Sequence, residues 1–183
     1  MKKTRLDLFN NDWYLPGGHI ISRASWYFVN AVFFINPFFT FSGIKVFLLK
    51  FFGAKVGKNV LIKPSVNIKY PWLLTIGDNV WIGEKVWIDN LCLVVIGDNV
   101  CISQGALLLT GNHNYKKESF DLTIGNIVLE EGVWIGANAT VCPNVKCKSH
   151  SILTVGSVAR SELKEYSIYQ GNPAIKIRER IVE

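Results

Sequence analysis

The sequence predicts a mainly β protein, built as a parallel β-helix, and three observations support this prediction. Apolar residues recur at every sixth position through most of the 183 residues. A small or β-branched residue follows most of them after four positions, and Gly, Asp, Asn or Lys fill many positions between, as in the run Ile-Gly-Asp-Asn-Val at 76–80. A period of six does not keep to one face of an α-helix, whereas it is the period of hexapeptide β-helix repeats.

Residues 1–52 lack this period and are expected to form an N-terminal arm and apolar helices. The stretch 24–44 contains no charged residue. Pro37 would break or kink a helix there, so we expect two shorter helices at about 22–35 and 41–52. The stretch is nearly long enough to span a bilayer, but its interruption favours helices that pack on the β-helix or on a neighbouring subunit. Docking on a membrane surface is left open.

Residues 53–160 are expected to form the β-helix, in which three hexapeptides complete one triangular coil and stacked coils bury a continuous apolar column. Within each run, the apolar anchors of the repeat are six residues apart: Val56, Ile62 and Ile68; Ile76, Ile82 and Ile88; Ile96, Ile102 and Leu108; then Leu129, Ile135, Val141, Cys147 and Leu153. A break at about 109–127 is expected to form an inserted loop. Residues 161–183 are expected to form a C-terminal turn and tail of the same structural domain.

His113 lies in this break, within the segment Thr-Gly-Asn-His-Asn-Tyr at 110–115. Loops on rigid scaffolds carry function disproportionately, and a neutral imidazole is the commonest general base near pH 7. We therefore expect His113 to be a catalytic base. The other two histidines are weaker candidates, because His19 lies in the N-terminal arm and His150 at a solvent-facing repeat position.

The composition favours an anionic partner. The formal net charge is +6 and the sequence pI is about 9.2. The basic residues are scattered and no nucleic-acid-binding motif is present, so coenzyme A, a nucleotide-linked sugar or an anionic membrane surface fits better than nucleic acid. The four cysteines include no Cys-x-x-Cys pair and are expected to be reduced.

Several segments resemble the hexapeptide-repeat acyltransferases: 53–57 (Gly-Ala-Lys-Val-Gly), 89–91 (Asp-Asn-Leu), 102–106 (Ile-Ser-Gln-Gly-Ala), 110–115, 133–136 (Val-Trp-Ile-Gly) and 171–174 (Gly-Asn-Pro-Ala). The chain is similar to the colanic acid biosynthesis acetyltransferase branch, near the galactoside and maltose acetyltransferases. The resemblance covers nearly the whole chain. It implies a left-handed coil, an acetyl-CoA-dependent O-acetyltransferase acting on a sugar or polysaccharide precursor, a homotrimer and a cytoplasmic location, with the inner face of the membrane left open.

The resemblance also implies roles for individual residues. Asn90 and Trp134 would contact the acceptor substrate. A turn-forming role for Asn90 is equally open, and Trp134 can line the acetyl-transfer site and pack in a trimer at the same time. Coenzyme A would lie along the later coils and the C-terminal segment, in contact with Ala137, Val155, Arg160, Ser161, Gly171 and Arg178. The family often has Thr-Lys where this chain has Arg160-Ser161, so the resemblance leaves the phosphate contacts open while a basic patch remains.

The same hexapeptide repeat is compatible with other functions. One is a hexapeptide acyltransferase with a different acceptor, such as an amino-sugar nucleotide or an amino acid. Another is a zinc enzyme of the carbonic-anhydrase kind, which needs three converging histidines. With three histidines in all and no pair at ligand spacing, no metal is expected. A purely structural β-helix would leave the His113 loop unexplained.

Overall fold

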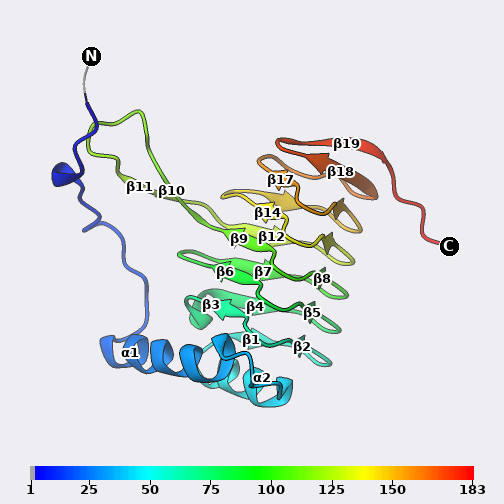
Figure 1. Ribbon diagram of the computed structural model, residues 1–183, viewed down its shortest axis with the longest axis horizontal. Helices are drawn as coiled ribbons and strands as arrows, with labels where there is room; N and C mark the ends of the chain where they lie inside the picture. Colours follow the sequence, from blue (N-terminus) through cyan, green and yellow to red (C-terminus); the bar gives the residue numbers. More distant parts are fainter. Residues whose placement is uncertain (1–2) are drawn as a thin grey trace.

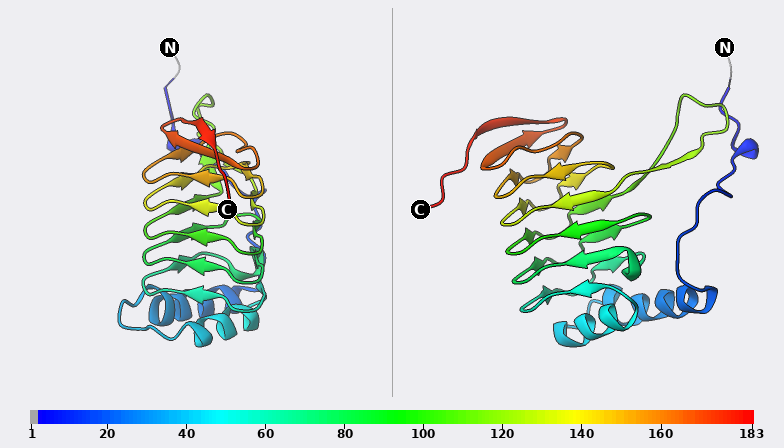
Figure 2. Two further views of the ribbon diagram at one scale, coloured as in Figure 1. Left: turned by 90° about the vertical axis from the view of Figure 1, so that its right-hand side faces the viewer. Right: turned by 180° about the vertical axis from the view of Figure 1, so that it is seen from behind.

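A computed structural model describes residues 3–183 as a parallel β-helix with helices at one end (Figure 1). The stack of coils forms three flat faces of parallel strands, as the six-residue period predicts, and one face ends in a single antiparallel strand. A hairpin projects from one edge of the column, and a pair of antiparallel strands closes the end opposite the helices (Figure 2). The predicted fold class is confirmed.

The three faces are built from strands that stack at the repeat spacing. Face 1 consists of β1 (Lys55–Val56), β4 (Leu74–Ile76), β7 (Val94–Ile96), β12 (Ile127–Leu129) and β15 (Lys146–Cys147). Face 2 consists of β2 (Leu61–Ile62), β5 (Trp81–Ile82), β8 (Cys101–Ile102), β13 (Trp134–Ile135), β16 (Ile152–Leu153), β18 (Ser167–Gly171) and β19 (Ala174–Glu179). Face 3 consists of β3 (Asn67–Ile68), β6 (Trp87–Asp89), β9 (Leu107–Leu109), β14 (Thr140–Val141) and β17 (Val158–Ala159).

The strand register places the apolar anchors directly above one another. On face 2, Ile62 pairs with Ile82, Ile82 with Ile102 and Ile102 with Ile135, and all four are buried. The residues four positions later are buried as well in most coils, Val80 and Val100 among them. Removal of these side chains from water is the main favourable contribution to folding of the column.

The turns between faces 1 and 2 account for the position of His150. Asn59, Asn79 and Asn99 occupy equivalent turn positions with φ of 54°, 57° and 57°, in the left-handed region that Asn tolerates. His150 continues the same column of turns with φ of 59°, and its ring packs on Tyr166 with centroids 4.7 Å apart. His150 is therefore a turn residue of the repeat.

The edge between faces 3 and 1 carries every insertion. The first coil inserts the 3-10 helix η3 (Pro71–Leu73) there. The third coil inserts the antiparallel hairpin of β10 (Gly111–His113) and β11 (Leu122–Ile124), which leaves the column at the predicted break (Figure 1).

The N-terminal helices cover the open end of the column. Helix α1 (Ile20–Val29) continues as a π-helical segment η2 (Asn30–Ile35), and α2 (Ser42–Phe51) follows after Pro37, close to the two predicted helices. Three of their side chains, Trp26, Phe34 and Leu49, are buried in the core. Before α1, an extended arm with the short 3-10 helix η1 (Leu6–Leu8) runs toward the hairpin. Among residues 3–183, no helix combines the length and apolar character that a membrane crossing requires.

The C-terminal segment is more regular than the expected turn and tail. Strand β18 pairs in parallel with β16 and so adds another rung to face 2, after which β19 folds back antiparallel onto β18. Gly171 ends β18 at the turn into β19, with a φ of 101° that only glycine adopts readily.

Candidate functional site

The hairpin holds the side chain of His113 in a defined position. His113 is the last residue of β10 and pairs with Leu122 of β11. Its imidazole stacks on the ring of Phe120, with centroids 4.4 Å apart and an interplanar angle of 6°. Its Nδ1 atom lies 2.9 Å from the carbonyl oxygen of Phe120. The ring is therefore oriented on one face and at one nitrogen by a residue of the same hairpin.

This contact decides which imidazole nitrogen is free. A carbonyl oxygen only accepts hydrogen bonds, so Nδ1 of His113 carries the proton and donates it to Phe120. In the neutral ring, Nε2 then keeps its lone pair. This is the arrangement that a general base requires, because the second hydrogen bond sets the tautomer.

Charged groups stabilise the hairpin near its tip. Lys117 and Asp121 form an ion pair of 2.8 Å, and the hydrogen bond from Lys117 holds the pKa of the Asp121 carboxyl below its usual value. The backbone N–H of Asn114 donates to the carbonyl oxygen of Asp121 at 2.8 Å. These contacts close the loop that links the two strands.

The N-terminal arm lies against the hairpin, an arrangement that the sequence did not predict. The backbone N–H of Arg5 donates to the carbonyl oxygen of Glu118 at 2.8 Å, and the ring of Phe9 lies 5.8 Å from the imidazole of His113. Farther along the arm, the hydroxyl of Tyr14 donates to the carbonyl oxygen of Leu91 at 2.8 Å. Burial raises the pKa of Tyr14 above its usual range, so the hydroxyl remains the donor.

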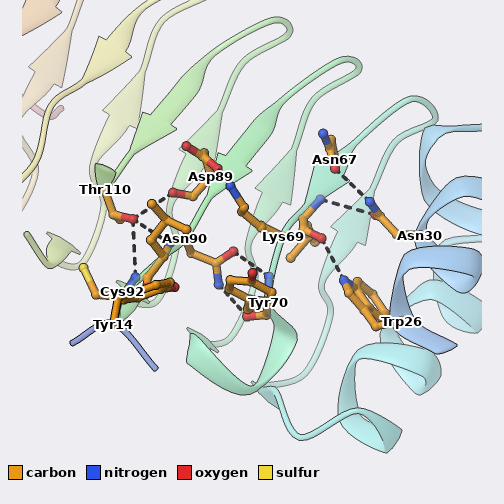
Figure 3. Close-up of polar contacts among 12 residues, drawn as sticks. Tyr14, Trp26, Asn30, Asn67, Lys69, Tyr70, Asp89, Asn90, Cys92 and Thr110 are labelled. Atoms are coloured by element: carbon orange, nitrogen blue, oxygen red, sulfur yellow. Dashed lines mark hydrogen bonds and ion pairs between the residues drawn. The ribbon is translucent and has the colours of Figure 1, made fainter. Parts of the chain in front are cut away.

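Asn90 lies between β6 and β7, where its side chain faces Tyr70 of the preceding coil and holds the edge of the column together (Figure 3). Its side chain is fully buried, and its amide oxygen accepts from the backbone N–H of Tyr70 at 3.0 Å while its amide nitrogen donates to the carbonyl oxygen of Tyr70. In the next coil, the hydroxyl of Thr110 donates to the carbonyl oxygen of Asp89 and accepts from the N–H of Leu91 at 2.7 Å. Within one chain Asn90 thus joins successive coils, and its contact with a substrate stays a prediction.

A second feature is a cleft of about 470 Å³ along the edge between faces 2 and 3. It is lined by Trp134, Ala137 and Val155, three residues that the sequence grouped at the substrate and cofactor sites. The indole N–H of Trp134 donates to the hydroxyl of Ser103 at 2.9 Å, which holds the ring against the cleft. Within the described chain, the backbone N–H groups of Ala137 and Val155 make no hydrogen bond.

The remaining predicted cofactor residues lie toward the C-terminal end. The backbone N–H of Gly171 donates to the hydroxyl of Ser157 at 3.0 Å, which places the C-terminal turn on the same edge as the cleft. Arg178 is exposed on β19. Arg160 lies on another edge, where it lines a groove of about 290 Å³ together with Asn112 at the base of the hairpin. Ser161 is exposed beside it.

One chain does not bring all these residues together. His113 leaves the column at the edge between faces 3 and 1, whereas the cleft with Trp134 follows the edge between faces 2 and 3. The strands of face 3 lie between the two edges. A complete site that uses both would therefore need a neighbouring copy of the chain.

The site contains no metal centre in the part of the chain that the structure describes, where no three His, Cys, Asp or Glu side chains converge to hold an ion. All four cysteines are free thiols. Burial raises the pKa of the Cys147 thiol to about 12, consistent with an inert core residue.

Sequence reasoning missed the residues that orient His113. Phe120 acts through its ring and its carbonyl oxygen, and Phe9 comes from more than a hundred positions away. The one available signal for Phe120 was a bulky apolar residue in an otherwise polar loop. It also has a φ of 52°, an uncommon conformation for an aromatic residue.

Comparison with known proteins shows that the chain is similar in sequence to a curated protein over most of its length. No family model matches it. It is 37% identical over 165 residues to the colanic acid biosynthesis acetyltransferase WcaF of Escherichia coli (strain K12), covering 90% of this chain and 91% of that protein.

Solved structures share the fold. A hexapeptide-repeat acetyltransferase from Vibrio cholerae, determined with acetyl coenzyme A, has a TM-score of 0.79 and 19% identity, covering 92% of this chain and 97% of that one. A maltose O-acetyltransferase from Clostridium difficile has a TM-score of 0.76 and 17% identity, covering 89% and 88%. At these identities the likeness extends to the fold alone.

Proposed function

The chain belongs to the hexapeptide-repeat acetyltransferases, and from this premise we propose that it transfers an acetyl group from acetyl-CoA to a hydroxyl group of a sugar or polysaccharide precursor. The observation that carries the proposal is the hydrogen bond between His113 Nδ1 and the carbonyl oxygen of Phe120, which leaves Nε2 free as a base. The relative named for colanic acid biosynthesis supports a glycan precursor as the acceptor class.

His113 would activate the acceptor. A sugar hydroxyl is a poor nucleophile until its proton is removed as the new bond forms. Nε2 of His113 takes that proton while the hydroxyl oxygen attacks the thioester carbonyl. When the tetrahedral adduct collapses, the carbon–sulfur bond breaks and the imidazolium returns the proton to the thiolate. The products are an acetyl ester and the free thiol of coenzyme A.

The cleft beside Trp134 would hold the donor. The pantetheine arm of coenzyme A carries amide groups, which match the unpaired backbone N–H groups of Ala137 and Val155. Gly171 stands on the same edge, and the exposed Arg178 would meet the phosphates, with Arg160 and Ser161 as further candidates. Apolar residues such as Ile152, Leu153 and Val155 line much of the cleft, which supports this assignment.

The active assembly would be a homotrimer in which one chain supplies His113 and its neighbour supplies the cleft. Support comes from the outer surface of face 2, where Leu61, Trp81, Cys101 and Trp134 stand in register as an apolar column. The indoles of Trp81 and Trp134 are 61% and 45% exposed in the single chain. A cyclic arrangement of three copies would bury such a column.

The proposal is tested by incubating the protein with acetyl-CoA and a panel of sugars and nucleotide sugars. Release of free coenzyme A thiol that depends on the acceptor, together with a product whose mass has increased by one acetyl group, is the expected result. Alkaline hydroxylamine separates an ester from an amide product, because it cleaves the ester. Acetylation of an amine alone would contradict the proposed O-acetylation, and a monomer with full activity in light scattering would contradict the shared site.

A further inference from the structure

The N-terminal cap exposes a large apolar surface that the proposed catalytic site does not use. Helices α1 and α2 turn one side toward the column, where Trp26, Phe34 and Leu49 are buried. The two helices and the π-helical segment η2 also carry exposed apolar side chains: Ile20, Ile21, Tyr27, Phe28, Val32, Ile35, Ile44, Phe47 and Phe51. Phe38 and Phe41, in the connection between the helices, are also exposed. We call this set of side chains the cap surface.

The cap surface is an end surface of the molecule. Both helices lie across one end of the β-helix, and the C-terminal strands lie at the opposite end (Figure 2). Helix α2 packs on β1 and β2 while η2 packs on β3, so the helices cover the first coil and their outer sides point away from the column. Phe47 and Phe51 stack on each other along that side, with centroids 6.4 Å apart.

The charge around this surface is predominantly positive. Residues 13–77 contain seven Lys or Arg residues and no Asp or Glu. Four of the lysines, Lys50, Lys55, Lys58 and Lys63, are exposed and form no ion pair in the described chain. A neighbouring copy would bring the same positive charge to the same surface. An anionic surface with an apolar interior is complementary both to the cations and to the aromatic side chains.

A cavity at the rim of the cap surface carries a further cation. It has a volume of about 480 Å³ where α1 meets face 3, and Arg23, Tyr27 and Lys69 are among its lining residues. Lys69 is paired with Asp89 at 3.0 Å, whereas Arg23 forms no ion pair within residues 3–183. The planar guanidinium suits a phosphate oxygen, so the rim provides a place for a lipid headgroup.

We infer that the cap surface docks the protein on a membrane that contains anionic phospholipid, with the aromatic side chains in the interfacial region and the lysines at the headgroups. The protein binds peripherally, because the helices lie across the end of the column and none of those described is long enough to span. Docking through the cap surface leaves the hairpin and the cleft uncovered, because both lie on later coils of the column.

The inference is tested with purified protein and sedimenting vesicles of two compositions. One is phosphatidylcholine alone, and the other is phosphatidylcholine and phosphatidylglycerol in equal amounts. The wild-type protein is expected to bind the anionic vesicles at least roughly tenfold more tightly than the neutral ones, with affinity falling as salt is added. Equal binding to both, or no binding to either, overturns the inference.

Two sets of variants separate the contributions. Phe28→Gln/Phe47→Gln/Phe51→Gln removes apolar area, and Lys50→Glu/Lys55→Glu reverses charge; each is expected to lower anionic-vesicle affinity by roughly tenfold or more. Matched controls at distant exposed positions, Ile181→Gln/Val182→Gln and Lys85→Glu/Lys116→Glu, are expected to bind like the wild type. Circular dichroism and coenzyme A release in solution verify that each variant is folded.

Light scattering distinguishes a cap surface that binds membranes from one that binds a second copy of this chain. If the cap surface joins copies of this chain, the triple phenylalanine variant changes the size of the soluble assembly and leaves vesicle binding as it was, which overturns the inference. An unchanged assembly with lost vesicle binding supports it. Because the solution acetyltransferase assay uses no vesicles, failure of docking and failure of the proposed activity are read independently.

Discussion

The imidazole of His113 contacts Phe120 in two ways across one hairpin. The two rings stack with their centroids 4.4 Å apart, and Nδ1 of His113 donates to the carbonyl oxygen of Phe120 at 2.9 Å. The ring stacking restricts the orientation of the imidazole, and the hydrogen bond selects its tautomer. Both constraints come from the residue seven positions later, Phe120, whose backbone has a φ of 52°. A base that is oriented before the substrate arrives requires little reorganisation during the reaction.

Replacing His113 by Asn is expected to lower kcat by about 10²–10⁴-fold, the usual effect of losing an acid–base group. Asn keeps a polar side chain without the basic nitrogen. Because the hairpin lies outside the repeat core, the variant should fold and bind acetyl-CoA as the wild type does. Phe120→Leu keeps the backbone carbonyl that selects the tautomer and removes only the ring stacking, so it should lower turnover much less than His113→Asn does. Near-normal turnover of His113→Asn would make His113 a structural loop residue.

Replacing Arg178 by Ala is expected to raise the KM for acetyl-CoA by roughly tenfold or more while kcat changes little, the scale of a lost hydrogen bond to a charged group. Arg178 is exposed and has no carboxylate partner in the described chain, so it is available for a phosphate. Lys176 serves as the comparison because its ammonium is already paired with Glu179. An unchanged KM in steady-state kinetics would place the phosphates elsewhere.

Gly136 is expected to tolerate no side chain. A Cβ atom there would lie 2.6 Å from the backbone nitrogen of Val155 and 2.7 Å from the carbonyl carbon of Thr154, so the next coil would have to move. Gly136→Ala should lower the free energy of unfolding by roughly 2–4 kcal/mol, as strain and overpacking do. Gly43 in α2 has nothing within 4 Å, and Gly43→Ala should instead stabilise by up to about 1 kcal/mol. Urea denaturation of both variants measures the contrast.

Lys45 is expected to make stability rise with pH in the alkaline range. Its side chain is fully buried and its Nζ donates to the carbonyl oxygen of Lys63 at 2.7 Å, while burial lowers its pKa to about 8. Between pH 8 and the unfolded value of 10.5 the unfolded chain binds more protons, so the free energy of unfolding increases with pH there. The full shift corresponds to about 3 kcal/mol at most.

The measurement compares wild type with Lys45→Met by urea denaturation at pH 7 and at pH 9.5. At pH 9.5 the free energy of unfolding of the wild type should be higher, relative to that of Lys45→Met, than at pH 7. The reason is that only the wild type loses a destabilising buried charge as the pH rises. If the free energy of unfolding changes equally with pH in the two proteins, Lys45 keeps an ordinary pKa.

The sequence by itself determined the coil. The burial of Ile82 or Val100 follows from its place in the hexapeptide, because a short strand and a turn of constant length send every sixth side chain inward. The same rule located the interruption and the histidine within it. Ala137 and Val155 were expected near coenzyme A from the resemblance to the acyltransferases, and the structure brings both to one cleft.

Only the tertiary structure decided how distant segments serve the site. The tautomer of His113 depends on the Phe120 carbonyl, and the support of the hairpin depends on Phe9, which no local pattern connects to it. Asn90 belongs to a fully paired contact with Tyr70, which a turn-forming residue type alone did not reveal. Periodicity reports whether a residue faces inward or outward, but hydrogen bonds and docking surfaces depend on which segments of the folded chain meet.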